Sequence, residues 1–309
     1  MKKQIAVILG PTATGKSHCG IALAQALDGE IISGDSMLVY RGMDIGTAKP
    51  TAEELALVPH HMVDILPPEA SFNVVDFKER AERLIDEITA RGKLPIIVGG
   101  TGLYIKALLE DYKFSSKGED SALRAELEAL LDEQGKDALY ARLVKSAPAE
   151  AGKIDINNTR RVIRAIEAAE SGDDLSHSKS EELVYDAAVF GLRMERSVLY
   201  ERINRRVDIM LEQGLIEETL RLLAEGVLET AQSMQAIGYR QTVLYLKGEW
   251  DKATAVEKIK QATRNFAKRQ FTWYKKMPYV KWFNFDAEPN YENVTAEMIK
   301  TVVEKFKIG

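Results

Sequence analysis

The stretch QIAVILGPTATGKS, residues 4–17, decides the fold of this chain. Its first six residues form a short apolar run rich in β-branched side chains, which is typical of a buried parallel strand. The segment that follows matches the pattern G-x-x-x-x-G-K-[ST]. From Ser17 onward, apolar residues recur at helical spacing as far as Asp28-Gly29. A strand, a glycine-rich loop and a helix in this order predict a phosphate-binding P-loop.

Each part of this loop has a chemical role toward phosphate. The glycines let backbone N–H groups turn inward around phosphate oxygens, and the positive end of the following helix adds to the attraction. Lys16 supplies a positive charge, and the Ser17 hydroxyl can ligate Mg²⁺, which is the expected cofactor. The residues predicted to bind the phosphate-bearing substrate are Gly10, Pro11, Thr12, Ala13, Thr14, Gly15, Lys16 and Ser17.

Two further apolar runs alternate with helical segments. EIISGD, from Glu30, and LPIIVGGTG, from Leu94, are predicted strands, and an amphipathic segment from Phe77 lies between them. This alternation predicts an α/β fold with a P-loop NTPase-like parallel sheet flanked by helices. Ligands bind at the carboxyl ends of such strands, so residues 10–17, 33–36 and 99–102 are expected along one rim.

The composition of the chain changes near Glu119. From there the sequence is highly charged, has helical spacing and contains no convincing strand, until AAVFGLRM (187–194) returns to a strand pattern. We therefore expect a catalytic core formed by 1–112 and 187–309, with basic C-terminal helices. Residues 113–186 are expected to form an all-helical insertion domain.

The bulk composition limits the class of protein. The net charge is -5, so an RNA partner has to be met by a local basic patch. The single cysteine, Cys19, excludes an intramolecular disulfide and suits a reducing compartment. No apolar run is long enough to span a bilayer, so we expect a cytoplasmic protein with no membrane partner.

Asp35 and Thr101 follow the second and third predicted strands. ATPases and GTPases place an aspartate after a second hydrophobic strand to hold Mg²⁺. Asp35 is therefore either a metal-binding carboxylate or a general base that faces the phosphate site. The loop alone favours a P-loop kinase acting on a small molecule or nucleoside. A non-enzymatic RNA-binding protein that uses the basic C-terminal helix is a third possibility.

Eight motifs together resemble those of the bacterial tRNA dimethylallyltransferase family, also called tRNA isopentenyltransferases or IPP transferases. In chain order they are GPTATGKS, SGDSMLVYRGMDIGTAKPT, PHHMVDI, IIVGGTGLYIKALL, NNTRRVIRAIE, LYERINRRVDIMLEQGLIEE, IGYRQ and ATRNFAKRQFTWYKK. The resemblance implies transfer of a dimethylallyl group from dimethylallyl diphosphate to the exocyclic N6 amine of the adenosine 3′-adjacent to the anticodon in tRNA. The products are N6-dimethylallyladenosine and diphosphate, and the loop would hold the diphosphate leaving group.

The resemblance also implies roles for individual residues. Asp35 would act as the general base that removes a proton from the amine, a contribution of about 10²–10⁴-fold. Lys16, Mg²⁺ and the family's diphosphate arginine would stabilise the charge of the leaving group. That arginine aligns with Arg206, and Arg202, one helical turn earlier, is the alternative. The implied catalytic residues are Asp35, Thr101, Lys16 and Arg206.

The target adenosine must leave its stacked loop to reach such a site. The matching family segment, Asp35 to Leu38, lines the pocket for the target base, although Leu38 stands where the family commonly has glutamine. Thr101 matches a threonine at the family's reaction channel, where it contacts the target nucleotide or a diphosphate oxygen.

Two basic segments are expected to contact tRNA. Residues 258–281 contain eight Lys or Arg and no Asp or Glu, with aromatic residues interleaved, as single-stranded RNA binding requires. Residues 157–161 match a tRNA-contacting region of the family. We expect a monomer with no obligate protein partner. The predicted tRNA-binding residues are Asp35, Ser36, Met37, Leu38, Thr101, Arg124, Thr159, Arg160, Arg161, Lys260, Arg264 and Lys268.

Overall fold

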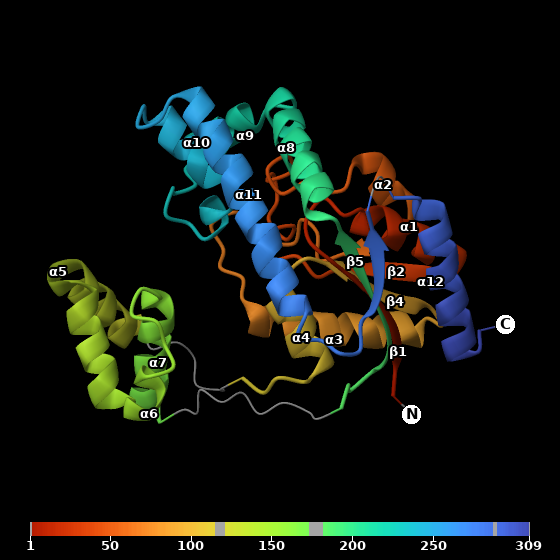
Figure 1. Ribbon diagram of the computed structural model, residues 1–309, viewed down its shortest axis with the longest axis horizontal. Coiled ribbons are helices and arrows are strands. Elements are labelled where there is room, and N and C mark those ends of the chain that lie inside the picture. Colours follow the sequence, from red (N-terminus) through yellow and green to blue (C-terminus); the bar gives the residue numbers. More distant parts are fainter. Residues whose placement is uncertain (1, 115–120, 173–181, 287–288, 309) are drawn as a thin grey trace. The chain divides into compact units, whose positions relative to one another are not determined.

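The structure is a computed structural model that describes residues 2–114, 121–172, 182–286 and 289–308. The chain forms two compact units, shown in Figure 1. One consists of Met1–Asp111 with Glu181–Gly309, and the other of Tyr112–Ser180. Asp186, assigned to the insertion from the sequence, is instead the first residue of a strand of the first unit.

The first unit is built on a six-stranded sheet in the order β3-β2-β4-β1-β5-β6, in which all neighbouring strands are parallel. This arrangement confirms the predicted α/β fold with a parallel sheet flanked by helices. The strands are β1 Gln4–Leu9, β2 Gly29–Ser33, β3 His60–His61, β4 Leu94–Gly99, β5 Asp186–Met194 and β6 Lys281–Phe285.

Both faces of the sheet are buried, as the apolar character of β1 predicts. Alternate residues of a strand point to opposite faces. Ile5 and Val7 belong to the core cluster that includes α3 (Val74–Ala90) and α4 (Gly102–Leu109), whereas Ala6 and Ile8 belong to the cluster with α1 (Lys16–Ala26) and α12 (Tyr291–Phe306). Helices thus cover both faces and leave the carboxyl rim of the strands for the site.

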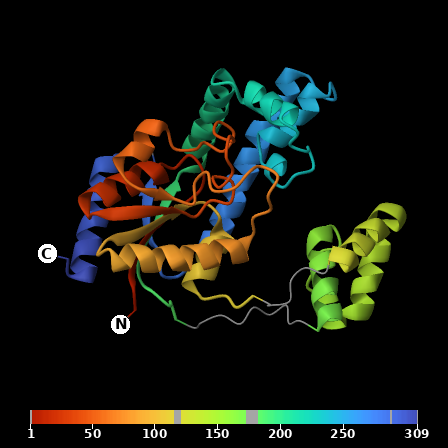
Figure 2. The ribbon, with the colours of Figure 1, turned by 180° about the vertical axis from the view of Figure 1, so that it is seen from behind.

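The α-helices between β5 and β6 stand beyond that rim, as Figures 1 and 2 show. The first of these helices, α8, begins directly after β5 and packs against the last of them, α11. The short helix α2 (Ala52–Leu57) is capped by Thr51 and Glu54 and lies in the segment between β2 and β3. The four helices are α8 Arg196–Glu212, α9 Leu215–Ala224, α10 Tyr239–Leu246 and α11 Lys252–Tyr274.

The second unit has its own hydrophobic core. It contains α5 (Ser121–Ser146), α6 (Pro148–Ala151) and α7 (Thr159–Ser171), and no strand occurs among its described residues. Gly135 interrupts α5 with φ 78°, which divides it into two helical segments. None of the helices in the described parts of either unit is long and apolar enough to cross a membrane.

Candidate active site

The P-loop joins β1 to α1, and its backbone requires glycine at one position in particular. Gly15 has φ +87°, in the left-handed region that favours glycine. A Cβ atom at Gly15 would also lie 2.3 Å from the ring of Tyr291. The sequence pattern therefore reflects both a conformational and a steric demand.

Three helices hold the loop in this shape. From α8, Arg202 Nε donates to the carbonyl of Ala13 at 3.0 Å. From α12, the Tyr291 hydroxyl donates to the carbonyl of Thr14 at 3.2 Å. On the other side, the backbone N–H of Thr12 donates at 3.0 Å to the side chain of a glutamine on α11. The loop is thus fixed by contacts from all three helices before any ligand arrives.

Lys16 is the charged group of the loop. Its Nζ donates to the carbonyl of Pro11 at 2.7 Å. Burial lowers the pKa of the Lys16 ammonium to about 8; the carboxylate of Asp35 opposes this shift and the cation of Arg206 adds to it. An anion bound at the loop would relieve both the desolvation and the repulsion from Arg206, so the site favours an anionic group such as a phosphate.

Asp35 lies half-buried just after β2. Its Oδ1 accepts the backbone N–H of Met37 at 2.9 Å. Loss of water raises the pKa of Asp35, although hydrogen bonds from Met37 and Leu38 and the charge of Lys16 act in the opposite direction. A carboxylate with a raised pKa is a stronger base than an ordinary aspartate, which suits proton abstraction.

Thr101 precedes α4 and meets the loop that carries Asp35. Its Oγ1 accepts the backbone N–H of Ser36 at 3.1 Å. The ends of β2 and β4 approach closely enough for this contact because Gly99 has no side chain. A Cβ atom at Gly99 would lie 2.3 Å from the carbonyl carbon of Gly34. The structure therefore brings Asp35 and Thr101 together with the P-loop, as the rim argument predicts.

A cavity of about 640 Å³ opens beside the start of α1. Ser17 and Arg206 line it together with Lys49 and Glu54. Arg206 has no ion pair among the described residues, whereas Arg202 is engaged with the P-loop backbone. Of the two arginines considered from the sequence, Arg206 is the one that faces a ligand-sized space.

The Ser17 hydroxyl fits a role in holding Mg²⁺. It is exposed at the first turn of α1 and lines the same cavity. The described residues contain no group of three or more His, Cys, Asp or Glu side chains arranged to hold a metal ion. Mg²⁺ prefers oxygen ligands and usually keeps several waters beside substrate phosphates, so one hydroxyl together with a diphosphate is a suitable donor set.

Gln270 was not singled out from the sequence, yet it connects two parts of the site. It is only 4% exposed on α11. Its Oε1 accepts the N–H of Thr12, and its Nε2 donates to the carbonyl of Gly100 at 2.8 Å. The sequence does contain a feature that could have drawn attention to Gln270: in the motif KRQFTW it is the only uncharged polar residue besides a threonine.

Glu218 is a second residue that sequence reasoning missed. Its buried carboxylate accepts the backbone N–H groups of Asp44, Ile45 and Gly46 at 2.9–3.2 Å. The hydroxyl of Tyr239 also donates to it at 2.6 Å. Glu218 and Tyr239 belong to the motifs GLIEE and IGYRQ, so these motifs hold the segment that lines the cavity beside Ser17.

Two of the three α11 cations predicted to contact tRNA are engaged with α8, and their contact with tRNA stays a prediction. Lys260, Arg264 and Lys268 do share one helix face, but much of that face packs on α8. Lys260 lies 2.6 Å from Asp208 and its side chain is only 14% exposed, while Arg264 donates to Asn204 at 2.7 Å. Only Lys268 of the three is exposed.

In the second unit, Arg160 and Arg161 are exposed at the start of α7, beside the half-buried Thr159. This combination of two cations with a helix N-terminus suits a phosphate. Arg124 is engaged elsewhere, because its Nε lies 2.8 Å from the buried carboxylate of Glu167. A tRNA contact by any of these residues stays a prediction.

The fold and the site define a P-loop α/β enzyme in which the phosphate-binding loop faces a half-buried aspartate, at a rim that carries a threonine from the neighbouring strand. The chain belongs to the IPP transferase family, whose family model matches residues 38–277.

Relatives resemble the chain over nearly its full length. A tRNA dimethylallyltransferase from an Exiguobacterium species is 47% identical over 99% of both chains. One from Geobacillus kaustophilus is 46% identical over 100% of this chain and 99% of the relative.

Solved structures show the same similarity. A tRNA isopentenylpyrophosphate transferase from Bacillus halodurans matches with a TM-score of 0.75 and 44% identity, over 99% of this chain and 97% of that one. A eukaryotic dimethylallyltransferase, described as acting on tRNA, matches with a TM-score of 0.76 and 27% identity, over 97% and 78% of the two chains.

Proposed function

We propose that this enzyme transfers a dimethylallyl group from dimethylallyl diphosphate to the N6 amine of the adenosine on the 3′ side of the tRNA anticodon. The observation that carries the proposal is the position of Lys16 at the P-loop after β1 and of Asp35 after β2, at the same edge of the parallel sheet, where Thr101 just after β4 binds the loop of Asp35. The ammonium of Lys16 can bind a diphosphate, and the carboxylate of Asp35 can accept a proton from an amine. The kinase alternative rested on the loop alone, and the relatives support the transferase.

The chemistry follows from these positions. The bond between the allylic carbon and the diphosphate oxygen breaks while the bond between that carbon and N6 forms. Asp35 takes the proton that N6 loses, and the electron pair of the broken bond leaves with the diphosphate. Lys16 and Arg206 stabilise the negative charge that develops there, because preorganised cations act most strongly where charge develops in the transition state. Ser17 would help to hold Mg²⁺, which would supply further neutralisation of the diphosphate.

The remaining residues position the two substrates. Thr101 and Ser36 border Asp35, so we place the flipped adenosine beside them. Arg160 and Arg161 of the second unit and Lys268 of the first unit are proposed to contact tRNA phosphates. The enzyme is proposed to act as a monomer in the cytoplasm, where tRNA is used.

The test is a transfer assay. Unmodified tRNA is incubated with the protein, Mg²⁺ and labelled dimethylallyl diphosphate, and the RNA is digested to nucleosides. Labelled N6-dimethylallyladenosine and one diphosphate per transfer are expected, with no consumption of ATP. Transfer of the terminal phosphate of ATP to an acceptor without any prenylated nucleoside would establish a kinase instead. RNA binding with neither reaction would leave only a binding protein.

A further inference from the structure

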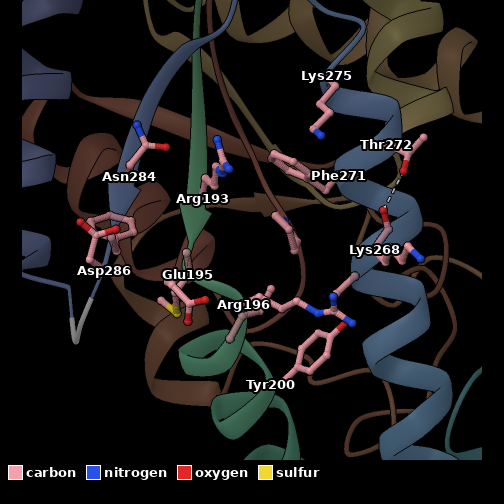
Figure 3. A pocket seen from close by; sticks show the side chains of 15 residues that line it. Arg193, Glu195, Arg196, Tyr200, Lys268, Phe271, Thr272, Lys275, Asn284 and Asp286 are labelled. Atoms are coloured by element: carbon pink, nitrogen blue, oxygen red, sulfur yellow. Dashed lines mark hydrogen bonds between the residues drawn. The ribbon is translucent and has the colours of Figure 1, made fainter.

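A second cavity, of about 680 Å³, lies on another side of the P-loop and is shown in Figure 3. It is formed by the end of β5, the first turns of α8, the C-terminal half of α11 and the end of β6. Pro11 of the P-loop contributes to its wall, yet it shares no lining residue with the cavity beside Ser17 and Arg206. The four cations that line it are Arg193, Arg196, Lys268 and Lys275.

Aromatic rings, not carboxylates, hold three of these cations. The guanidinium of Arg193 lies 5.0 Å from the ring centre of Phe271, and the ammonium of Lys275 lies 4.9 Å from the same centre. Arg196 lies 5.0 Å from the ring centre of Tyr200. A ring attracts a cation without neutralising it or using its N–H donors fully. Among the described residues none of the four cations has an ion-pair partner, so their charge remains available.

The acidic residues of this cavity do not cancel that charge. Glu195 caps α8, where its carboxylate accepts the backbone N–H groups of Ser197 and Val198, and Asp286 is exposed at the end of β6. Four positive and two negative side chains leave a net charge of +2. Buried apolar side chains, among them Leu199 and Phe285, complete the wall. The cavity thus suits a ligand with an anionic group and a flat apolar surface.

We infer that this cavity binds one nucleotide of the single-stranded RNA that flanks the target adenosine. The phosphodiester would lie on the cations held by Phe271 and Tyr200, and the base would lie against the apolar wall. Positive charge combined with aromatic side chains is what single-stranded RNA binding requires. The inference rests on the proposed function for the identity of the RNA. The small diphosphate substrate already has a site at Lys16 and Ser17, so a separate basic cavity serves the other phosphate-bearing substrate.

The experiment uses the full-length protein with Arg193→Gln and Arg196→Gln combined, and with Lys275→Gln as a separate variant. Glutamine keeps much of the side-chain length and removes the charge. The matched controls are Arg205→Gln on the exposed side of α8 and Lys300→Gln on α12, and neither residue lines this cavity or the one beside Ser17. Dissociation constants for unmodified tRNA are measured over a range of salt concentrations, and unfolding midpoints show that each variant is folded.

The double variant is expected to bind unmodified tRNA at least about tenfold more weakly. The logarithm of the association constant falls as the logarithm of the salt concentration rises, and each phosphate contact contributes about 0.7 to the steepness of that fall for single strands. Loss of two contacts should therefore reduce the steepness by about 1.4. Lys275→Gln should lower it by about half as much, and the controls should retain the parent slope. An unchanged tRNA affinity and slope in the folded variants would overturn the inference.

Two further probes separate the possible sources of phosphate. Adenosine monophosphate and inorganic pyrophosphate are titrated into the parent protein and the double variant. Loss of binding to either probe, with tRNA affinity unchanged, would assign the cavity to a free small molecule and refute RNA binding. The transfer assay on the parent protein tests the proposed function independently, because RNA affinity can depend on the cavity whether or not a prenyl group is transferred.

Discussion

We expect Lys16 to set an upper pH limit on the activity of this enzyme. Burial lowers its pKa to about 8, and only the protonated form places a positive charge on the diphosphate. Above the pKa the protonated fraction falls about tenfold per pH unit. We therefore expect kcat/KM for dimethylallyl diphosphate at about pH 9 to be roughly a tenth of its plateau value, since kcat/KM reports groups of the free enzyme.

The substitution Lys16→Arg should remove this limit. A guanidinium stays protonated in proteins, so the alkaline fall of kcat/KM should disappear up to about pH 10. The plateau itself should be lower, because the wider guanidinium fits the loop less well. The acid side of the profile should be the same in both proteins: if Asp35 is the base, as proposed, activity is lost as the pH falls through its raised pKa.

The assay is initial-rate prenyl transfer at constant ionic strength from about pH 5 to about pH 10. Lys300→Arg, an exposed substitution on α12, is the matched control and should keep the parent profile. An alkaline fall that persists near pH 8 in Lys16→Arg would assign the limit to another group. A parent profile that stays flat to about pH 9.5 would refute the reasoning from burial.

Three further substitutions test the site. Asp35→Asn keeps an acceptor for Met37 but cannot take the proton, so turnover should fall about 10²–10⁴-fold while the tRNA dissociation constant changes little; a fall of only a few-fold would exclude the general base. Gln270→Leu leaves the Thr12 N–H without its acceptor and should cost about 1–3 kcal/mol in urea unfolding and raise the KM for dimethylallyl diphosphate. Gln261→Leu, exposed on the same helix, is its control, and equal effects of the two would contradict this role. Glu218→Gln removes acceptors from backbone N–H groups of residues 44–46 and should cost about 3 kcal/mol, whereas its exposed neighbour Glu217→Gln should cost little.

Much of the site could be predicted because its parts are local. The strand, loop and helix around Lys16 are continuous in the chain, and each has a pattern that nearby residues determine. Asp35 and Thr101 could be placed beside the loop because parallel strands end at one edge of the sheet. The residues missed were those whose partners are distant: Gln270 bonds Thr12 across 258 positions, and Glu218 bonds Asp44 across 174.

The contacts of the α11 cations could not be predicted for the same reason. Lys260 and Arg264 lie on one face of α11, since residues four apart are neighbours on a helix. Spacing cannot say what covers a face, and here α8 supplies Asp208 and Asn204. The second cavity could not be predicted from spacing either. Its cations Arg193, Arg196 and Lys275 are far apart in the chain or lie on different elements, and only the packed fold brings them together.

The sequence by itself predicted strands β1, β2, β4 and β5, the phosphate-binding loop and the family, because these depend on short stretches whose residue types are read one after another; the short strand β3 and the strand β6 were not predicted. The tertiary structure alone decided which arginine faces the cavity beside Ser17, which cations are engaged with neighbouring helices and how three helices hold the loop. The physical reason is that a side chain's charge and hydrogen bonds act on whatever lies within a few ångströms, and that neighbourhood is set by packing between segments far apart in the chain.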